Sequence, residues 1–410
     1  MIKVVQLQYS LTTAGKQSIR LHNAFSLAGI DSCLVSLYSD KSDDEKIIQL
    51  GRKPKLIAKL DNKLQEFLTK NSIKKFGLFS YPLFGSDVSQ LPEIKNADII
   101  YLHWVLNGFL NLSGIEKIAK LNKPVIIFLH DMWPITGGCH HSFECNKYMT
   151  GCNNCQMFPG TKNNDFSAIE FKKKLKLFSK FNNLYFVSPS TWLYNCAKKS
   201  LLTSAKKIYH IPNIIDNKLF RPLDKKEAKK KLNIGIDETV IAFGAVSIES
   251  PYKGWEYLKK SLELLQKNEK GNKITILAFG SNYERQIVDA IPFKIKFMGY
   301  VRDESVMTLI YNAADVFITP SLADSFSLVT LESLCCGTPV VAFKIGGIPD
   351  LIEHKKNGYL ANYRDAEDLA EGITFCIDSN IKGYMLPFFD PALTVRKHLD
   401  LFEQVLSFKN

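Results

Sequence analysis

Two carboxylates, Asp324 and Glu332, are the residues whose types and positions best suit binding chemistry. An apolar strand is predicted to end at Thr319, and a helix is predicted to begin near Ser327. The unpaired backbone N–H groups and the positive end of such a helix can hold a diphosphate. Glu332 follows about two helical turns later, where a carboxylate can accept hydrogen bonds from ribose hydroxyls. The segment therefore predicts a nucleotide site, although the bare carboxylate pair is weak support on its own.

A second stretch of the chain supplies a cation for the same predicted phosphate site. The strand 240–243 leads into a loop with Gly244 and Ser247, and Lys253 stands at the start of the following helix. This placement sets an ammonium group over bound phosphates. A Lys-Gly pair is usually a surface turn, which is the alternative. The predicted donor-binding residues of this half are Gly244, Ser247, Lys253, Ser325, Phe326, Ser327, Leu328 and Glu332.

The first half of the chain offers two weaker candidates. Gly15 follows the first predicted strand and precedes a helix, where a glycine lets the backbone approach a diphosphate. The strand that ends at Leu129 is followed by His130 and Asp131, and ligands of open α/β sheets bind at such strand ends. We predict that His130 contacts the substrate. The alternative is a structural histidine beside a helix-capping aspartate.

Four cysteines gather in one Gly- and Asn-rich stretch and predict a metal site. They are Cys139, Cys145, Cys152 and Cys155. Their spacing suits tetrahedral thiolate ligation, with structural zinc as the first choice and two histidines, at 140 and 141, as spare ligands. A zinc ion held by four thiolates would be closed and without a catalytic role. A labile disulfide arrangement and plain packing are the alternatives.

The elements that must position these residues follow an alternating pattern. Short runs rich in Val, Ile and Phe alternate with longer amphipathic stretches, which is typical of βαβ units around a parallel sheet. The segment 210–222 contains two prolines and is predicted to form the boundary between two domains. The predicted fold class is α/β, with two doubly wound Rossmann-like domains whose parallel sheets face a cleft. The predicted domains are 1–220, on which a C-terminal helix at 391–410 packs back, and 221–390.

Length and composition agree with two soluble domains. The chain has 410 residues, of which 46% are hydrophobic and 23% charged, and this length exceeds one comfortable core. Gln6 and Gln8 interrupt the first apolar run, so it reads as a strand and not as a signal peptide. No stretch approaches the roughly 18 apolar residues that span a bilayer. We therefore expect a cytoplasmic protein.

The formal net charge of +12 points to anionic partners. Lysines concentrate in the N-terminal half, which suits an anionic membrane surface at the inner face of the plasma membrane. A solvated lysine-rich surface is the alternative. Because no base-reading module is present, nucleic acid is not an expected partner.

The second half resembles the donor half of family 4 glycosyltransferases. The resemblance covers most of residues 235–380 closely and the first domain more loosely. It implies the two-domain GT-B fold and transfer of a sugar from a nucleoside diphosphate sugar with retention of configuration. The matching positions are Gly299, Asp315, Pro320, Ser321, Asp324, Glu332, Gly337 to Val341, Gly346, Gly347, Asn357 and Gly358.

Three positions depart from the family pattern. Asp324 stands where the family usually has a glutamate near the donor sugar. The arginine that often precedes the lysine corresponding to Lys253 is missing, and Gly15 is single where a glycine pair is usual. The segment His-Asp-x-Trp-Pro-x-Thr-Gly-Gly-Cys from His130, with its trailing cysteines, resembles a subgroup that acts in bacterial polysaccharide assembly, such as capsule, exopolysaccharide or lipopolysaccharide.

The resemblance also implies roles in catalysis. Lys253 and the amides of residues 326–328 would stabilise the leaving diphosphate, while Asp324 and His130 would orient the sugar. No catalytic metal is expected because an Asp-x-Asp motif is absent from the sequence. The expected acceptor is a saccharide or a lipid-linked saccharide. The alternatives are a nucleotide-sugar 2-epimerase of the same fold and a catalytically silent nucleotide-sugar-binding subunit.

Overall fold

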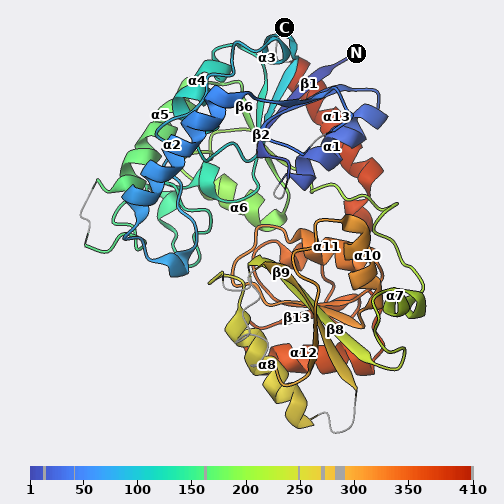
Figure 1. The fold of residues 1–410 in the computed structure, drawn as a ribbon. Coiled ribbons are helices and arrows are strands. Elements are labelled where there is room, and N and C mark those ends of the chain that lie inside the picture. Colours follow the sequence, from blue (N-terminus) through green and yellow to red (C-terminus); the bar gives the residue numbers. More distant parts are fainter. Residues whose placement is uncertain are drawn as a thin grey trace. The chain divides into compact units, whose positions relative to one another are not determined.

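The computed structural model describes residues 1–12, 15–40, 42–160, 164–247, 250–268, 273–281 and 291–407, without the side chains of 245–247, 268 and 281. The chain divides into two compact units (Figure 1). Unit 1 comprises Met1–Ile214 and Pro391–Asn410, and unit 2 comprises Ile215–Asp390. Each unit is built around one parallel sheet.

The sheet of unit 1 has seven strands in the order β3-β2-β1-β4-β5-β6-β7, and every pairing is parallel. Every residue of β4, β5 and β6 is buried, as in strands covered on both faces. The strands are β1 (Lys3–Ser10), β2 (Asp31–Tyr38), β3 (Ile47–Gln49), β4 (Ile99–Leu102), β5 (Val125–Phe128), β6 (Leu184–Ser188) and β7 (Ile208–His210).

Helices of unit 1 form a separate apolar core on each face of its sheet. On one face Val5 and Leu7 of β1 belong to a core that also contains side chains of α2, α4 and α5. On the other face Val4 packs with α1 and α13, including Phe402. This division follows the alternation of side chains along a strand. The helices are α1 (Lys16–Leu27), α2 (Arg52–Thr69), α3 (Pro92–Asn96), α4 (Leu112–Ala119), α5 (Phe166–Lys180), α6 (Thr191–Lys199) and α13 (Pro391–Ser407).

Unit 2 repeats this plan with a six-stranded parallel sheet in the order β10-β9-β8-β11-β12-β13. Its two faces again carry separate cores. The strands are β8 (Thr239–Ser247), β9 (Ile274–Ser281), β10 (Lys294–Phe297), β11 (Val316–Thr319), β12 (Val340–Phe343) and β13 (Gly358–Ala361). The helices are α7 (Lys225–Lys231), α8 (Trp255–Asn268), α10 (Glu304–Ala313), α11 (Leu328–Cys335) and α12 (Ala366–Asp378).

The predicted fold class of two Rossmann-like parallel-sheet units is confirmed. Strands β3, β7 and β13, which lie at sheet edges, were not predicted; β3 and β7 have only three residues, and β13 begins with a glycine. Among the described residues, no helix is both long enough and apolar enough to cross a membrane.

Candidate functional site

A pocket of about 130 Å³ lies in unit 2 at the carboxyl ends of β8 and β11. Its lining includes Gly244 within β8, three residues before the end of that strand, Lys253 before α8 and Ser321 after β11. Open α/β sheets bind ligands at this edge. The pocket therefore has the position that the sequence predicts for a nucleotide site.

The loop that carries Lys253 is held against the end of β11. Gly254 has φ +70°, and a Cβ atom there would collide with the carbonyl oxygen of Pro320. The backbone N–H of Leu322 donates to the carbonyl of Tyr252 at 2.7 Å. A larger residue at position 254 would push the loops apart, so the glycine is what brings Lys253 to the pocket.

Asp324 joins Lys253 to the start of α11. Its Oδ1 accepts the backbone N–H groups of Phe326 at 3.1 Å and Ser327 at 2.8 Å, and its Oδ2 lies 3.7 Å from Lys253 Nζ. Two of the amides predicted to bind a diphosphate therefore donate to Asp324 in this structure. The carboxylate acts as the cap of α11, since Ser327, which has φ +66°, makes no capping side-chain bond.

Glu332 lies inside unit 2 and not in the lining of the pocket. Its side chain is buried on α11, and its Oε2 accepts a hydrogen bond of 3.1 Å from the hydroxyl of Tyr311 on α10. Tyr311 is fully buried. The contact of Tyr311 with Glu332 could not be predicted, because the sequence does not show which residues of two different helices meet.

The remaining donor-side candidates have mixed placements. Gly244 sits so close to the ring of Phe279 that a Cβ atom would collide with it. Ser325 is buried, and the Ser327 hydroxyl lies 2.8 Å from that of Thr330. Leu328 is the first residue of α11. The side chain of Ser247 lies outside the described residues.

In unit 1, Gly15 stands directly before α1. Its φ of −94° is open to any residue, but a Cβ atom would collide with the carbonyl oxygen of Ser10 and with Leu11. Gly15 therefore lies directly against the backbone of Ser10 and Leu11. The glycine is required by this close approach and not by an unusual backbone angle.

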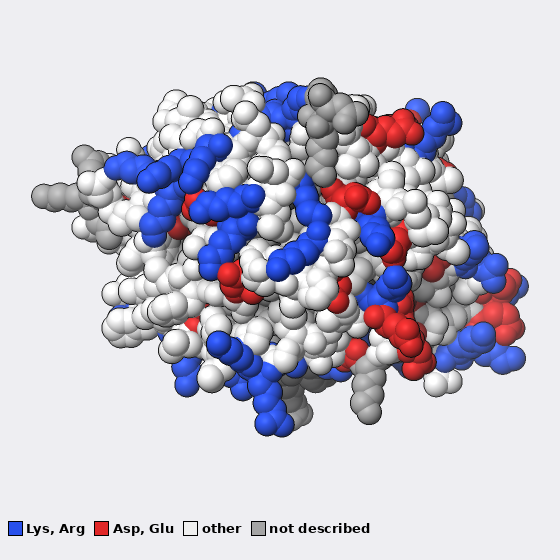
Figure 2. Space-filling model, turned by 90° about the horizontal axis from the view of Figure 1, so that it is seen from above, with Lys and Arg blue, Asp and Glu red and all other residues white. Residues whose placement is uncertain are grey.

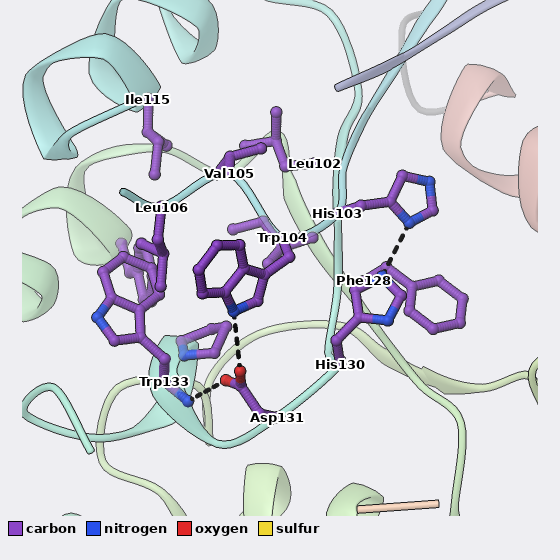
Figure 3. A pocket seen from close by; sticks show the side chains of 13 residues that line it. Leu102, His103, Trp104, Val105, Leu106, Ile115, Phe128, His130, Asp131 and Trp133 are labelled. Atoms are coloured by element: carbon purple, nitrogen blue, oxygen red, sulfur yellow. Dashed lines mark hydrogen bonds between the residues drawn. The ribbon is translucent and has the colours of Figure 1, made fainter. Parts of the chain in front are cut away.

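His130 is one end of a buried hydrogen-bonded chain (Figure 3). A bond of 3.0 Å joins His130 Nε2 to His103 Nδ1, and His103 Nε2 lies 2.8 Å from Gln6 Oε1. Because the amide oxygen of Gln6 only accepts, His103 donates from Nε2 and accepts at Nδ1 from His130. Burial lowers the pKa of His130 to about 4 and the pKa of His103 well below its usual range. Both rings are neutral at pH 7, which leaves Nδ1 of His130 as its acceptor nitrogen.

Asp131, the residue next to His130, holds a second group of side chains through hydrogen bonds. Its oxygens accept from the indole N–H of Trp104 at 3.2 Å and from the backbone N–H of Trp133 at 2.8 Å (Figure 3). They also accept from His140 Nδ1 at 2.6 Å, and His140 Nε2 lies 2.8 Å from Ser80 Oγ. Burial works against the Asp131 charge, but His140 and the backbone N–H of Trp133 lower its pKa to about 2. Asp131 is therefore an anion that fixes two tryptophans.

These two polar groups border a small, largely aromatic and aliphatic cavity of about 20 Å³ at the carboxyl ends of β4 and β5. The sequence reasoning found His130 there but missed Trp104 and His140. Trp104 could have been found, because it closely follows the end of the strand predicted at 99–103. His140 could not, since it was grouped with the cysteines as a spare ligand, and both of its ring nitrogens are used in protein contacts.

The four clustered cysteines are free thiols in a loop-rich part of unit 1. Cys152 accepts a hydrogen bond from the backbone N–H of Gly137 at 3.2 Å. Burial raises the pKa of Cys139 and of Cys152 to about 12. Across the described ranges, no group of three or more His, Cys, Asp or Glu side chains is arranged to hold a metal ion. The structural zinc site at Cys139, Cys145, Cys152 and Cys155 stays a prediction.

Most of unit 2 is similar in sequence to known proteins. Residues 237–379 match the sequence model of the family "Glycosyl transferases group 1". A D-inositol 3-phosphate glycosyltransferase from Segniliparus rotundus is 30% identical over 164 residues, which are 38% of this chain and 36% of that protein. The chain thus matches only about a third of this relative's length.

Solved structures match over nearly the full chain. A glycosyltransferase from Rickettsia africae has a TM-score of 0.66 at 16% identity and covers 99% of this chain and 98% of its own. The Anabaena protein HepE, solved with UDP and glucose, has a TM-score of 0.58 at 18% identity and covers 100% of this chain and 99% of its own. At these identities the likeness establishes the fold, which is the GT-B fold expected from the sequence.

Proposed function

We propose that the chain is a retaining glycosyltransferase that moves a sugar from a nucleoside diphosphate sugar to an acceptor hydroxyl. The observation that carries the proposal is the pocket at the ends of β8 and β11, where Lys253 stands beside the Asp324 cap of α11. Both residues fall within the segment 237–379 that matches the glycosyltransferase family. Because the similar structure of HepE was solved with UDP and glucose, UDP-glucose is the first donor to test.

In the proposed reaction, the bond between the anomeric carbon and the diphosphate oxygen breaks as the acceptor oxygen bonds to the same carbon. The acceptor hydroxyl gives its proton to the departing diphosphate, so no other reactant is needed. Charge accumulates on the diphosphate in a transition state with oxocarbenium character. A cation and helix N–H groups at that position stabilise the charge as it develops.

We assign Lys253 to the leaving diphosphate. In the structure its ammonium lies 3.7 Å from Asp324, and a bound diphosphate would offer it a stronger partner. Asp324 already holds the first turn of α11 through two N–H groups. Its proposed role is therefore to position Lys253 and the helix start, with any contact to the sugar coming second. Glu332 does not line this pocket, and we assign it to the ribose hydroxyls on the resemblance of its segment to the glycosyltransferase family alone.

We assign unit 1 to the acceptor and the transferred sugar. The acceptor nitrogen of His130 can receive a hydrogen bond from a sugar hydroxyl at the carboxyl ends of the strands, where ligands of open α/β sheets bind. The family match covers unit 2 alone, so the inositol phosphate acceptor named for the relatives does not carry over. A saccharide or lipid-linked saccharide of surface polysaccharide synthesis is the acceptor that we propose.

The test is a thermal-shift screen of UDP-, GDP- and ADP-sugars, followed by calorimetry on the best donor. The donor is expected to stabilise the wild-type chain, and Lys253→Met is expected to weaken its binding by about tenfold. Lys260→Met, which changes an exposed lysine on α8, is the matched control and should bind as the wild type does.

Turnover is then measured with and without saccharide acceptors. New glycoside formed with retained configuration would support the transferase. Epimerised sugar formed without any acceptor would instead identify the 2-epimerase. Tight donor binding with no product for any acceptor would identify a silent binding subunit, and failure of every nucleotide sugar to bind would overturn the proposal.

A further inference from the structure

The outer face of α2 carries an apolar stripe that no other part of the described chain covers. Leu56, Leu60 and Phe67 are 68%, 56% and 63% exposed. Their spacing places them on one side of the helix, because residues four and seven apart share a face. Figure 1 shows α2 as the long helix on the flank of unit 1, remote from α1 and α13. Exposed apolar patches on soluble domains mark interaction sites.

Polar contacts fix which side of α2 faces the protein. The buried side presents Asp61 and Gln65. Asp61 Oδ1 accepts the backbone N–H groups of Leu83 and Phe84 at 2.9 and 2.8 Å, and Gln65 Oε1 accepts that of Tyr81 at 2.8 Å. Two polar side chains therefore lie on the inner side of α2, while Leu56, Leu60 and Phe67 lie on its outer side. Since rotation of the helix would break these bonds, the exposure of the stripe is built into the fold.

A second close contact holds the same orientation. Gly108 has φ +75°, and a Cβ atom there would collide with the backbone of Ala58 on the buried side of α2. Ala58 is fully buried. The helix is therefore seated tightly along its inner side and cannot roll to hide its leucines.

Basic side chains border the stripe on both sides. The segment 52–78 has eight basic residues and two acidic ones, of which Asp61 points inward. Lys53, Lys59, Lys63 and Lys70 are exposed, and Lys70 Nζ lies 4.8 Å from the ring centre of Phe67. Figure 2 shows basic side chains spread over the surface seen from above. A helix with exposed leucines and flanking lysines has the composition of interfacial membrane helices.

We propose that the outer face of α2 docks on an anionic lipid bilayer, with Leu56, Leu60 and Phe67 entering the headgroup boundary and the lysines contacting lipid phosphates. Charge complementarity selects this occupant. Two copies of the chain would bring the same basic borders together, and the resulting repulsion disfavours self-association through this face. An anionic leaflet supplies both the apolar phase and the negative charge.

The experiment is flotation with vesicles of phosphatidylcholine alone and of phosphatidylcholine with phosphatidylglycerol. The wild-type chain is expected to float with the anionic vesicles and to be released when NaCl is raised from about 0.1 M to about 0.5 M. The triple variant Leu56→Ser, Leu60→Ser, Phe67→Ser should bind these vesicles at least about tenfold more weakly.

The matched control replaces three exposed leucines elsewhere in unit 1, Leu27→Ser, Leu201→Ser and Leu393→Ser, and should float as the wild type does. Equal melting temperatures of the variants exclude loss of fold. The proposal is overturned by full binding of the triple variant, by equal binding to neutral vesicles, or by a wild-type dimer that becomes a monomer in the triple variant. The assay uses no donor or acceptor, so its result is independent of the proposed reaction.

Discussion

At the residue scale, the candidate groups depend on buried partners that come from distant parts of the sequence. Glu332 is oriented by the hydroxyl of Tyr311 from another helix. His130 is oriented by His103 and, through it, by Gln6 of the first strand. In both cases one hydrogen bond fixes the orientation of the Glu332 carboxylate or the His130 ring, and with it the direction of the remaining lone pairs.

Replacing Tyr311 with Phe tests the Tyr311–Glu332 bond. The ring stays in place while Glu332 loses the hydroxyl that donates a hydrogen bond to it. We therefore expect the affinity for the nucleotide sugar to fall by about threefold to tenfold. Tyr359→Phe removes a comparable hydroxyl bond, to Asp368 at 2.7 Å, and should leave donor affinity unchanged. Calorimetric titration measures both variants. Equal losses in the two would show that the effect is general to unit 2.

The buried histidines predict acid sensitivity. Burial lowers the pKa of His130 to about 4, that of His398 to about 3, and that of His103 well below its usual range. In the unfolded chain these groups titrate near 6.5. Because the unfolded state binds more protons below that value, the stability is complete above pH of about 6.5 and falls as the pH drops toward about 4.

Urea unfolding at pH values from about 7 to about 5 measures this slope. His398→Asn keeps a side chain that can hydrogen-bond to Tyr101 but cannot titrate in this range, so its urea midpoint should fall less steeply with pH than that of the wild type. The histidine account fails if both slopes are equal.

At the element scale, α11 is held at its start by Asp324 and carries Glu332 further along. Replacing Asp324 with Ala should lower the free energy of unfolding of unit 2 by about 1 to 2 kcal/mol, because two N–H groups lose their acceptor. It should also weaken donor binding, because Lys253 loses the carboxylate that positions it.

The matched control is Asp365→Ala, which removes the cap of α12, where Asp365 accepts the N–H groups of Glu367 and Asp368. It should lose similar stability but keep its donor affinity. Urea titration and calorimetry separate the two effects. Unchanged donor affinity in Asp324→Ala would contradict the positioning role.

The loop that carries His130 and Asp131 depends on a buried lysine of α5. Lys174 Nζ donates to the carbonyl oxygens of Trp133 at 2.6 Å and Thr136 at 3.1 Å, and it lies 3.5 Å from the ring centre of Trp133. Burial lowers the Lys174 pKa to about 8, against the opposing charge of Glu170.

Lys174→Met leaves the two carbonyls without this donor, and we expect it to lower the free energy of unfolding by about 2 to 4 kcal/mol. Lys176→Met, an exposed neighbour on the same helix, should change it by less than about 0.5 kcal/mol. Urea midpoints decide the matter. Equal values for the two variants would show that the buried contacts do not hold the loop.

At the scale of the whole molecule, the chain returns at its end to the unit in which it began. Helix α13 belongs to unit 1, and its Leu401, Phe402 and Val405 are buried in the core with Phe25 of α1. Phe389, a few residues earlier, belongs to a core of unit 2. Each unit thus has its own apolar interior and can unfold in its own transition.

Calorimetry of two core variants tests this independence. Phe402→Ala should lower the melting temperature of one transition, and Phe389→Ala should lower that of the other, each through a loss of about 3 to 5 kcal/mol. If both variants shift one shared transition equally, the units unfold together.

The sequence by itself determined the fold class and most central strands. Apolar runs such as 125–128 must be buried on both faces, and alternation with amphipathic helices leaves a parallel sheet as the economical arrangement. It also determined that Asp324, Lys253 and His130 follow strand ends or precede helices, because that placement depends on local order alone. Three short edge strands, β3, β7 and β13, escaped prediction, since their pairing depends on a neighbour's backbone more than on their own residues.

Only the tertiary structure decided what these side chains contact. It showed that Asp324 caps α11 beside Lys253, that Tyr311 holds Glu332, and that His140 serves Asp131 and Ser80. It also showed that the leucines of α2 face outward. The physical reason is that hydrogen bonds and burial act at distances of a few ångströms, whereas partners such as Lys253 and Asp324, or Tyr311 and Glu332, are separated by tens of residues along the chain. Local patterns fix where an element begins and ends, and packing alone fixes which groups meet.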